Sequence, residues 1–478
     1  MGRPGRAGRA VSARRSRRSL LAAVAALGPA CAACAAPWAP AAPAAPAGTP
    51  GPVVGGRPVA RLRLVIAREG LPALDAAVDQ AVAATGAATA TAVEAQSLEA
   101  FTAGGPAAGG PAATAHRLLA AVQAGTPPDA VLLLGRDAQV ARLQAQGLVQ
   151  DVSGLMRRLR ARLGGTSRVN ETLHVIAGRW FAVPWYQRLV GHWARLPLPL
   201  PLSGGAPDGV LSYDALRLTL AGRAPDDPGW GIGGADSADA DAWCWGAIHA
   251  WGGGLADRKG ERVNLDTPQT VAALEWLAAT LAGARVHPQA GAWTDGEKNA
   301  AFGRGETAYT YTERALPGID GAGPEVSYLR TLAGPVARPR AVGGGAAWLL
   351  PRGPAPEAAE RFLEALLDAV QQRRLWGAGG RFALPGYLGG WDDPAIAGAP
   401  WAATAARFRA ELDLDGDAFV SASGNGGPET GAAQAVGALR FGAGMLRAVL
   451  AGRPAAAAVA EAHARAVALY RDFGLPGA

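Results

Sequence analysis

Residues 61–146 alternate between strand-like and helix-like segments, and this order constrains the fold more than any other feature. The pattern predicts strands and helices in turn at 61–67, 71–85, 90–94, 115–124, 129–134 and 137–146. The third strand, DAVLLL, is an unbroken apolar run, which is typical of a parallel strand buried on both faces. The β-α-β-α-β-α order therefore predicts a doubly wound α/β unit.

The segment RWFAVPWYQRLVGHW, which begins at Arg179, holds five aromatic residues in a chain that is only 6% aromatic. We expect a short strand over residues 180–183 that Pro184 breaks. Ligands of open α/β sheets bind outside the carboxyl ends of the strands. The break therefore predicts Trp180 and Phe181 in the core, with Trp185 and Tyr186 facing a ligand. Trp193 is expected to pack in the interior.

The N-terminus has the pattern of an export signal. Residues 1–34 hold seven arginines and no acidic residue. The apolar run LLAAVAALGPACAACAA, residues 20–36, follows the last of these arginines. A basic region before a short apolar region is typical of a signal peptide, and Ser16–Leu21 (SRRSLL) is similar to a twin-arginine motif. Two alternatives stay open at its end: lipid modification of Cys31 or Cys34, or cleavage at a small-residue site. Residues 35–60 are rich in Pro and Ala, which predicts a semi-rigid tether.

Charge and motifs exclude several function classes. The chain carries a formal charge of +7, but the signal region supplies seven of its 46 basic residues, so the rest is close to neutral and nucleic acid is not an expected partner. Cys244 is the single cysteine beyond the signal region, so no disulfide framework and no cysteine metal site are expected. The six histidines have no zinc-site spacing, and the sequence contains neither a GxSxG nor a GxxxxGK[ST] motif. No metal and no cofactor are predicted.

A resemblance rests on several segments in order. They are LLAAVQAGTPPDAVLLL, AQVARLQAQGLVQDVSGLM, GRWFAVPWYQRLVGHW, SYDALR, WGGGLADRKGERVNLDTPQTVAALEWL, AFGRGETAYTYTERA, VGGGAAWLLPRGPAPEAAERFLEALL and GRFALP. In this order and spacing the chain resembles, over about residues 61–478, the family 1 extracellular solute-binding proteins of ABC importers, the maltose-binding-like group.

The resemblance implies a type II periplasmic-binding-protein fold: two α/β lobes joined by a hinge, with the ligand in a cleft between them. We assign residues 61–168 and 312–372 to lobe 1, and residues 169–311 and 373–478 to lobe 2. Residues 1–34 are then the export signal and residues 35–60 the tether.

The resemblance also implies a set of cleft residues. Glu313 and Arg314 stand where many members have a Gly-Pro-Trp turn, and Ala315 replaces the stacking Trp, which argues against a maltodextrin. An aromatic ring covers the apolar face of a sugar, and planar Arg, Asp and Glu groups bond its hydroxyls. The predicted ligand contacts are Arg136, Asp137, Trp185, Tyr186, Arg188, Asp241, Trp243, Glu313, Arg314, Gly344, Gly345 and Arg381.

The function implied is an extracytoplasmic binding protein, a monomer, that delivers a sugar or sugar derivative to an ABC permease. A lipid anchor would be its only membrane contact. Two alternatives are a binding protein that reports to a sensor, and an exported enzyme that acts on glycans with Asp241 or Glu313 as general acid.

Overall fold

The protein is described from a computed structural model. The described residues are 53–54, 57–58, 60–103, 111–135, 139–188, 191–195, 211–222, 229–232, 237–283, 286–312, 326–329, 332–337, 340–341, 345–353, 355–412, 419–420, 424 and 430–478. The predicted export signal and most of the predicted tether lie outside them. Within the tether range, β1 (Val53–Val54) pairs with β2 (Arg57–Pro58).

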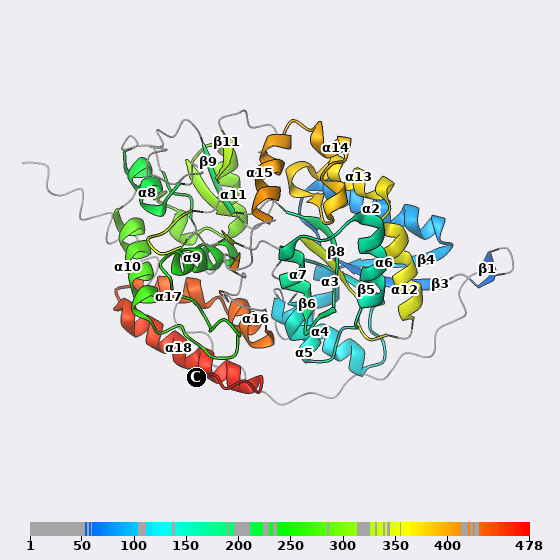
Figure 1. Cartoon of the computed structure of the whole chain (residues 1–478), viewed down its shortest axis with the longest axis horizontal. Coiled ribbons are helices and arrows are strands. Elements are labelled where there is room, and N and C mark those ends of the chain that lie inside the picture. Colours follow the sequence, from blue (N-terminus) through cyan, green and yellow to red (C-terminus); the bar gives the residue numbers. More distant parts are fainter. Residues whose placement is uncertain are drawn as a thin grey trace, which may run out of the picture.

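The chain forms two lobes, which lie on the left and right of Figure 1. The first lobe is built on a six-stranded mixed sheet with the order β14-β8-β13-β5-β3-β4. Its strands are β3 (Ala60–Ile66), β4 (Thr91–Ser97), β5 (Ala130–Leu134), β8 (Val183–Gln187), β13 (Ala346–Leu349) and β14 (Leu384–Pro385). β3, β4 and β5 are parallel, whereas β13 runs antiparallel to both β5 and β8.

Helices cover both faces of this sheet, as the alternation of strands and helices predicted. Along β5, Leu132 and Leu134 enter one core and Val131 and Leu133 enter the other. The first core is covered by α2 (Pro72–Ala88), α6 (Ser153–Leu163), α12 (Pro356–Leu366) and α13 (Ala369–Gly379), and the second by α3 (Leu98–Thr102), α4 (Pro111–Gln123) and α5 (Val140–Ala145). β5 is thus the doubly buried strand that its apolar run indicated.

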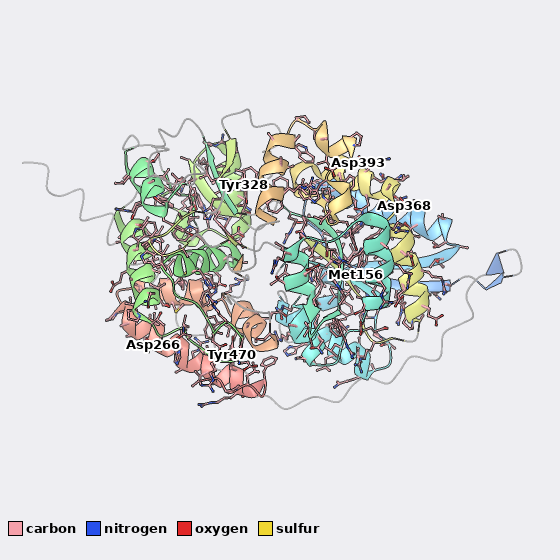
Figure 2. All side chains as sticks on the ribbon, viewed as in Figure 1. Met156, Asp266, Tyr328, Asp368, Asp393 and Tyr470 are labelled. Carbon is pink, nitrogen blue, oxygen red and sulfur yellow. The ribbon has the colours of Figure 1, made fainter. Side chains whose placement is uncertain are left out.

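The second lobe has a separate core around a three-stranded antiparallel sheet and several helices. β9 (Gly191–Arg195) lies between the other two strands, β10 (Tyr309–Thr312) and β11 (Val326–Leu329). The helices are α8 (Tyr213–Ala221), α9 (Ala238–Ala250), α10 (Pro268–Gly283), α11 (Asp295–Arg304), α16 (Gly431–Ala438), α17 (Phe441–Leu450) and α18 (Ala455–Asp472). Figure 2 marks Tyr470 in this lobe and Met156 in the first.

Several segments cross between the lobes. β8 of the first lobe leads to β9 of the second through residues 188–190, and β12 (Arg340–Ala341) pairs in parallel with β15 (Phe419–Val420). A further core cluster joins the lobes: Trp193 and Tyr328 of the second lobe pack with Phe382 and Phe408 of the first. Phe408 belongs to α15 (Ala402–Leu412), which lies between the lobes in Figure 1.

The remaining elements are short. They are α7 (Arg168–His174), β6 (Val175–Ile176), β7 (Arg179–Trp180), α14 (Pro394–Ala397) and the 3-10 helices η2 (Ala290–Ala292), η4 (Gly380–Phe382) and η5 (Leu388–Gly390).

Strand pairing moves all three of the predicted lobe boundaries. β11 pairs with β9 in the sheet of the second lobe, although residues 312–372 were assigned to lobe 1. β8 and β14 are hydrogen-bonded members of the six-stranded sheet, although residues 169–311 and 373–478 were both assigned to lobe 2. The first lobe therefore extends at least to Gln187 and takes in residues 384–385. Sequence pattern missed this because β8 contains a proline and β14 is only two residues long.

Candidate functional site at the carboxyl edge of the sheet

One edge of the six-stranded sheet gathers the predicted site residues of the first lobe. β3, β4, β5 and β8 end at this edge and β13 and β14 begin there, as their pairing directions require. We call it the carboxyl edge. Tyr186 and Arg188 lie at the end of β8, Gly345 directly precedes β13, and the backbone of Arg381 lies in η4 just before β14.

Half of the predicted contacts are not described by the structure in full. Arg136, Asp137, Glu313, Arg314 and Gly344 lie outside the described residues, as does the side chain of Arg381. Their role as ligand contacts stays a prediction.

A buried polar cluster of Glu69, Tyr186 and Arg188 lies at the carboxyl edge. The Arg188 Nη1 atom is 3.3 Å from Glu69 Oε2, and the Tyr186 hydroxyl donates to Glu69 Oε1 at 3.2 Å. The side chains of Arg188 and Glu69 are only 5% and 2% exposed. Burial raises the pKa of Tyr186 well above its ordinary value, and the neighbouring Glu69 carboxylate raises it further, so the phenol stays protonated and can donate.

Hydrogen bonds around the cluster fix its backbone. The Asp75 carboxylate in the first turn of α2 accepts from the amides of Glu69 and Gly70 at 3.0 and 3.1 Å. On the other side, Gln187 Nε2 donates to Asn170 Oδ1 at 2.6 Å. Since these partners come from α2 and α7, two helices orient the polar end of β3 and β8.

Gly345 acts through its backbone. A Cβ atom at this position would overlap the carbonyl oxygen of Tyr186, so only glycine permits this approach of β13 to β8. Its own carbonyl accepts from the Gly135 amide at 2.9 Å. Gly345 therefore lets β13 and β8 approach each other at the carboxyl edge, where the family resemblance predicted a loop of the cleft.

The strand break that predicted Trp185 at the ligand site is wrong. Pro184 does not break the strand, because it pairs with Ala347 inside β8. The register shifts between Ala346 and Ala347, so β8 carries an extra residue, and such a bulge re-aims the neighbouring side chains. Trp185 is fully buried beside Trp348, with ring centroids 5.5 Å apart, and belongs to the core.

Of the aromatic segment, the core predictions are confirmed. Trp180, Phe181 and Trp193 are all buried in core clusters. Tyr186 is also buried, but its hydroxyl bonds a charged group at the carboxyl edge. Tyr186 is thus an aromatic residue of this segment whose polar atom bonds a charged group at the carboxyl edge.

Asp241 and Trp243 on α9 are placed in the core of the second lobe rather than at a surface. Asp241 is fully buried and accepts from the amide of Ala443 at 3.0 Å, in the first turn of α17. A carboxylate there stabilises the start of a helix. Trp243 is fully buried, and its ring centroid lies 6.0 Å from that of Trp230. Neither side chain is exposed in this structure, because α9 is buried along nearly its whole length.

The second lobe holds its own buried charges near the crossing from β8 to β9. Lys298 of α11 lies 2.6 Å from Asp239 of α9 and also donates to the Tyr311 carbonyl, and both charged side chains are almost fully buried. Next to it, Asn299 Nδ2 donates to Thr312 Oγ1 at 2.9 Å, and Thr312 pairs with Gly191 at the start of β9. Through Lys298, Asp239 and the Tyr311 carbonyl, these contacts fix α9, α11 and β10 to one another.

Sequence analysis missed Glu69, Asp239 and Lys298. A signal existed for Glu69, because it directly follows the first strand, at the end where ligands of α/β sheets bind. No comparable signal pointed to Asp239 or Lys298, whose pairing depends on the packing of two helices.

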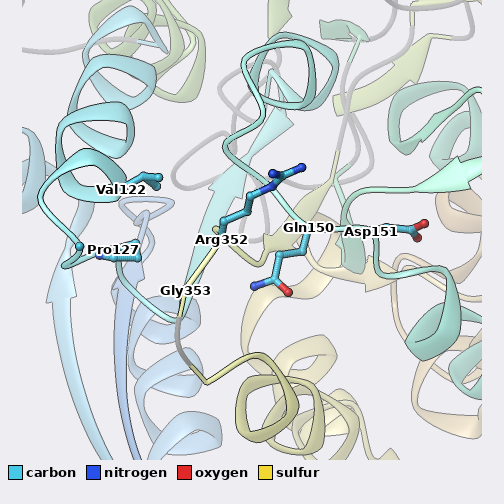
Figure 3. A pocket seen from close by; sticks show the side chains of 7 residues that line it. Val122, Pro127, Gln150, Asp151, Arg352 and Gly353 are labelled. Atoms are coloured by element: carbon cyan, nitrogen blue, oxygen red, sulfur yellow. The ribbon is translucent and has the colours of Figure 1, made fainter.

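A depression of about 650 Å³ lies at the opposite edge of the same sheet (Figure 3). Val122, Gly125, Pro127, Gln150, Asp151, Arg352 and Gly353 line it. Asp151 and Arg352 are exposed, so the depression has size but lacks buried polar groups.

Other chemistry has little support in the described part of the chain. No group of three or more His, Cys, Asp or Glu residues there could hold a metal ion. His174 and His192 are buried and His249 is half-buried, and the loss of solvation lowers their pKa values to about 4, 3 and 4 respectively. Among the described helices, none is long and apolar enough to cross a membrane.

Solved structures of solute-binding proteins share this fold at low sequence identity. A solute-binding protein of an ABC transporter from Thermotoga lettingae, bound to alpha-D-tagatose, is 14% identical with a TM-score of 0.65, covering 86% of this chain and 100% of its own. A sugar transporter from Arthrobacter chlorophenolicus with bound laminaribiose is 16% identical with a TM-score of 0.66, covering 85% of this chain and 99% of its own. Maltose-bound MalE3 of T. maritima is 15% identical with a TM-score of 0.62, covering 87% of this chain and 99% of its own.

The family comparison agrees with the fold. No curated protein among those compared is similar enough in sequence to match the chain. The model of the bacterial extracellular solute-binding proteins matches residues 108–389, which is more than half of the chain. These residues include β5, β8 and β13, whose ends form most of the carboxyl edge, as well as all three strands of the second lobe. With its two α/β lobes and this match, the chain belongs to the family of bacterial extracellular solute-binding proteins.

Proposed function

We propose that the protein captures a carbohydrate or sugar derivative between its lobes, outside the cytoplasm, and delivers it to an ABC permease. The observation that carries the proposal is the buried Glu69–Tyr186–Arg188 cluster at the carboxyl edge, beside a segment that crosses to the other lobe. Solved relatives of the same fold hold tagatose, laminaribiose and maltose.

The chemistry of the cluster suits a polyhydroxylated ligand. Carboxylate and guanidinium groups offer fixed acceptors and donors, and hydrogen bonds to charged groups are stronger than neutral ones. Because Arg188 already neutralises Glu69, the pair offers both kinds of group without a net charge. Arg136, Asp137 and Arg381 follow or precede strands at the same edge, so we propose them as further contacts together with Gly344.

We propose that the ligand site lies between the carboxyl edge and the second lobe, with Glu313 and Arg314 following β10 on the far side. Binding without catalysis is part of the proposal, because the family comprises binding proteins. A monomer attached through an N-terminal tether, with or without a lipid on Cys31 or Cys34, fits delivery to a permease.

A thermal-shift screen tests the proposal. Tagatose, laminaribiose and maltose are compared with uncharged polyols and with amino acids, because a ligand that binds only the folded state raises the melting temperature. We expect at least one sugar to raise it by a few degrees, and amino acids to leave it unchanged. If amino acids stabilise the protein and no sugar does, the carbohydrate assignment is wrong.

A further inference from the structure

α5 of the first lobe and α16 of the second lie against each other (Figure 1). Val140 and Leu143 of α5 belong to a core of the six-stranded sheet, whereas Ala432, Ala433 and Val436 of α16 belong to the core of the second lobe. This contact therefore joins two separately packed bodies.

The start of α5 is capped from the other lobe. The first amides of a helix lack partners within it, and Gln139, the residue before α5, has a left-handed backbone and no side-chain cap. Instead, the amide of Arg142 donates to Gln434 Oε1 of α16 at 3.0 Å. The Oε1 atom of Gln139 accepts from Arg142 Nη1 at 3.0 Å.

Small residues of the two helices meet at this contact. A Cβ atom at Gly431, the first residue of α16, would lie at an ordinary van der Waals distance of 3.4 Å from the Cβ of Ala145 in α5. Arg142 is partly buried, and burial lowers its pKa. The hydrogen bond from the Arg142 amide to Gln434 is a specific interaction between the two helices.

A second described contact between the lobes is of a different kind. Trp193, Phe382 and their aromatic neighbours form a continuous buried cluster across the lobes. Separating such a cluster would expose large apolar surfaces, since each aromatic side chain buries roughly 150–250 Å². At the α5–α16 contact, by comparison, the side chains that meet at Gly431 and Ala145 are small, and parting the helices would leave the Arg142 amide to bond water.

We propose that the arrangement of the lobes seen here is the closed one, and that Gln434 is a positioning residue that holds the lobes in it without touching ligand. The α5–α16 contact is the side that parts when the protein opens, and the aromatic cluster is the side that stays together. The effect on sugar affinity rests on the proposed function, whereas the effect on the arrangement of the lobes does not. Since loss of a helix cap typically costs about 1 kcal/mol, Gln434→Ala should weaken sugar binding about fivefold by depopulating the closed state.

The test needs no ligand. Hydrogen exchange and small-angle X-ray scattering are measured on the full chain for the parent, Gln434→Ala and Gln434→Glu. The glutamate retains an acceptor and adds a negative charge at a helix start, which is stabilising. Gln146→Ala, an exposed glutamine at the end of α5, is the matched control.

We expect amides 140–145 to exchange at least about threefold faster in Gln434→Ala, with a larger radius of gyration, and to exchange more slowly in Gln434→Glu. Gln146→Ala should match the parent. Unchanged exchange and scattering in Gln434→Ala would overturn the proposal. Faster exchange without a change in scattering would overturn it too, because Gln434 would then cap α5 without holding the lobes.

Discussion

The two edges of the six-stranded sheet differ in the burial of their charged groups. The opposite edge carries a depression of about 650 Å³, lined by the exposed Asp151 and Arg352. The carboxyl edge carries Glu69 and Arg188, which are only 2% and 5% exposed and are bonded to each other, with Tyr186 also donating to Glu69.

The Glu69–Arg188 pair combines burial with a position at the carboxyl ends of the strands, where ligands of α/β sheets bind. Burying an ion pair costs desolvation energy that its own attraction does not always return, so such a pair has a specific reason to exist. Exposed charges at a rim cost little and are common. We therefore place the proposed ligand site at the carboxyl edge, and the following variants test how far the two edges differ.

The largest effect is expected at Trp185, directly beside the carboxyl edge. Trp185→Ala should lower the free energy of unfolding by roughly 4 kcal/mol, because the ring is fully buried against Trp348. Chemical denaturation measures the change, and Trp185→Phe should recover much of the loss. A Trp185→Ala protein of parental stability would return Trp185 to the ligand site and contradict the core assignment.

The next largest effect compares one arginine from each edge. Arg188→Ala leaves the Glu69 carboxylate buried without its partner and should cost roughly 3 kcal/mol. Arg352→Ala, the matched variant at the opposite edge, should change stability by less than about 0.5 kcal/mol because its side chain is exposed. Equal losses in the two variants would remove the distinction between the edges.

A smaller effect is expected from one hydroxyl group. Tyr186→Phe removes the donor to Glu69 and should cost about 1 kcal/mol and weaken binding of any sugar found in the screen. Tyr387→Phe is the control, since its hydroxyl lies 3.8 Å from the Met156 sulfur in the same core rather than beside Glu69. Calorimetric titration of both variants separates a site effect from a packing effect, and equal sugar affinity in the two would argue against Tyr186 at the site.

The smallest effect concerns pH at the opposite edge. Partial burial acts to raise the pKa of Asp151, but hydrogen bonds from Ser153 and the nearby Arg179 hold it below its ordinary value. A lowered pKa contributes stability above the ordinary carboxyl pKa near 4, and that stability is lost as pH falls through the lowered value. Asp151→Asn should therefore be slightly less stable than the parent at pH 7, and the difference should vanish near pH 2. Thermal melts at both pH values measure it, and a difference that persists at pH 2 would contradict the assignment.

Periodicity predicted much of the first lobe. The apolar run of β5 and the alternation before it indicated a sheet covered on both faces, and the cores on its two sides confirm this. The two-lobe fold and the family followed from the order of motifs. These features depend on local sequence, which pattern analysis can detect.

The site was harder to predict, because burial depends on tertiary packing. Pro184 looked like a strand breaker, yet it sits beside a bulge where β13 already shifts register. Asp241 looked like a cleft carboxylate, but its partner, the amide of Ala443, lies 202 residues away. The Lys298–Asp239 pair likewise forms only when α9 and α11 meet.

Hydrogen exchange with a bound sugar tests the central claim most directly. The full chain is compared with and without whichever of maltose, laminaribiose or tagatose gives the largest thermal shift. We predict slower exchange at residues 67–70 and 186–195, around Glu69 and Arg188, and unchanged exchange at residues 122–129 and 350–353 around the depression. Protection confined to the residues around the depression would contradict the account and move the binding site to the opposite edge.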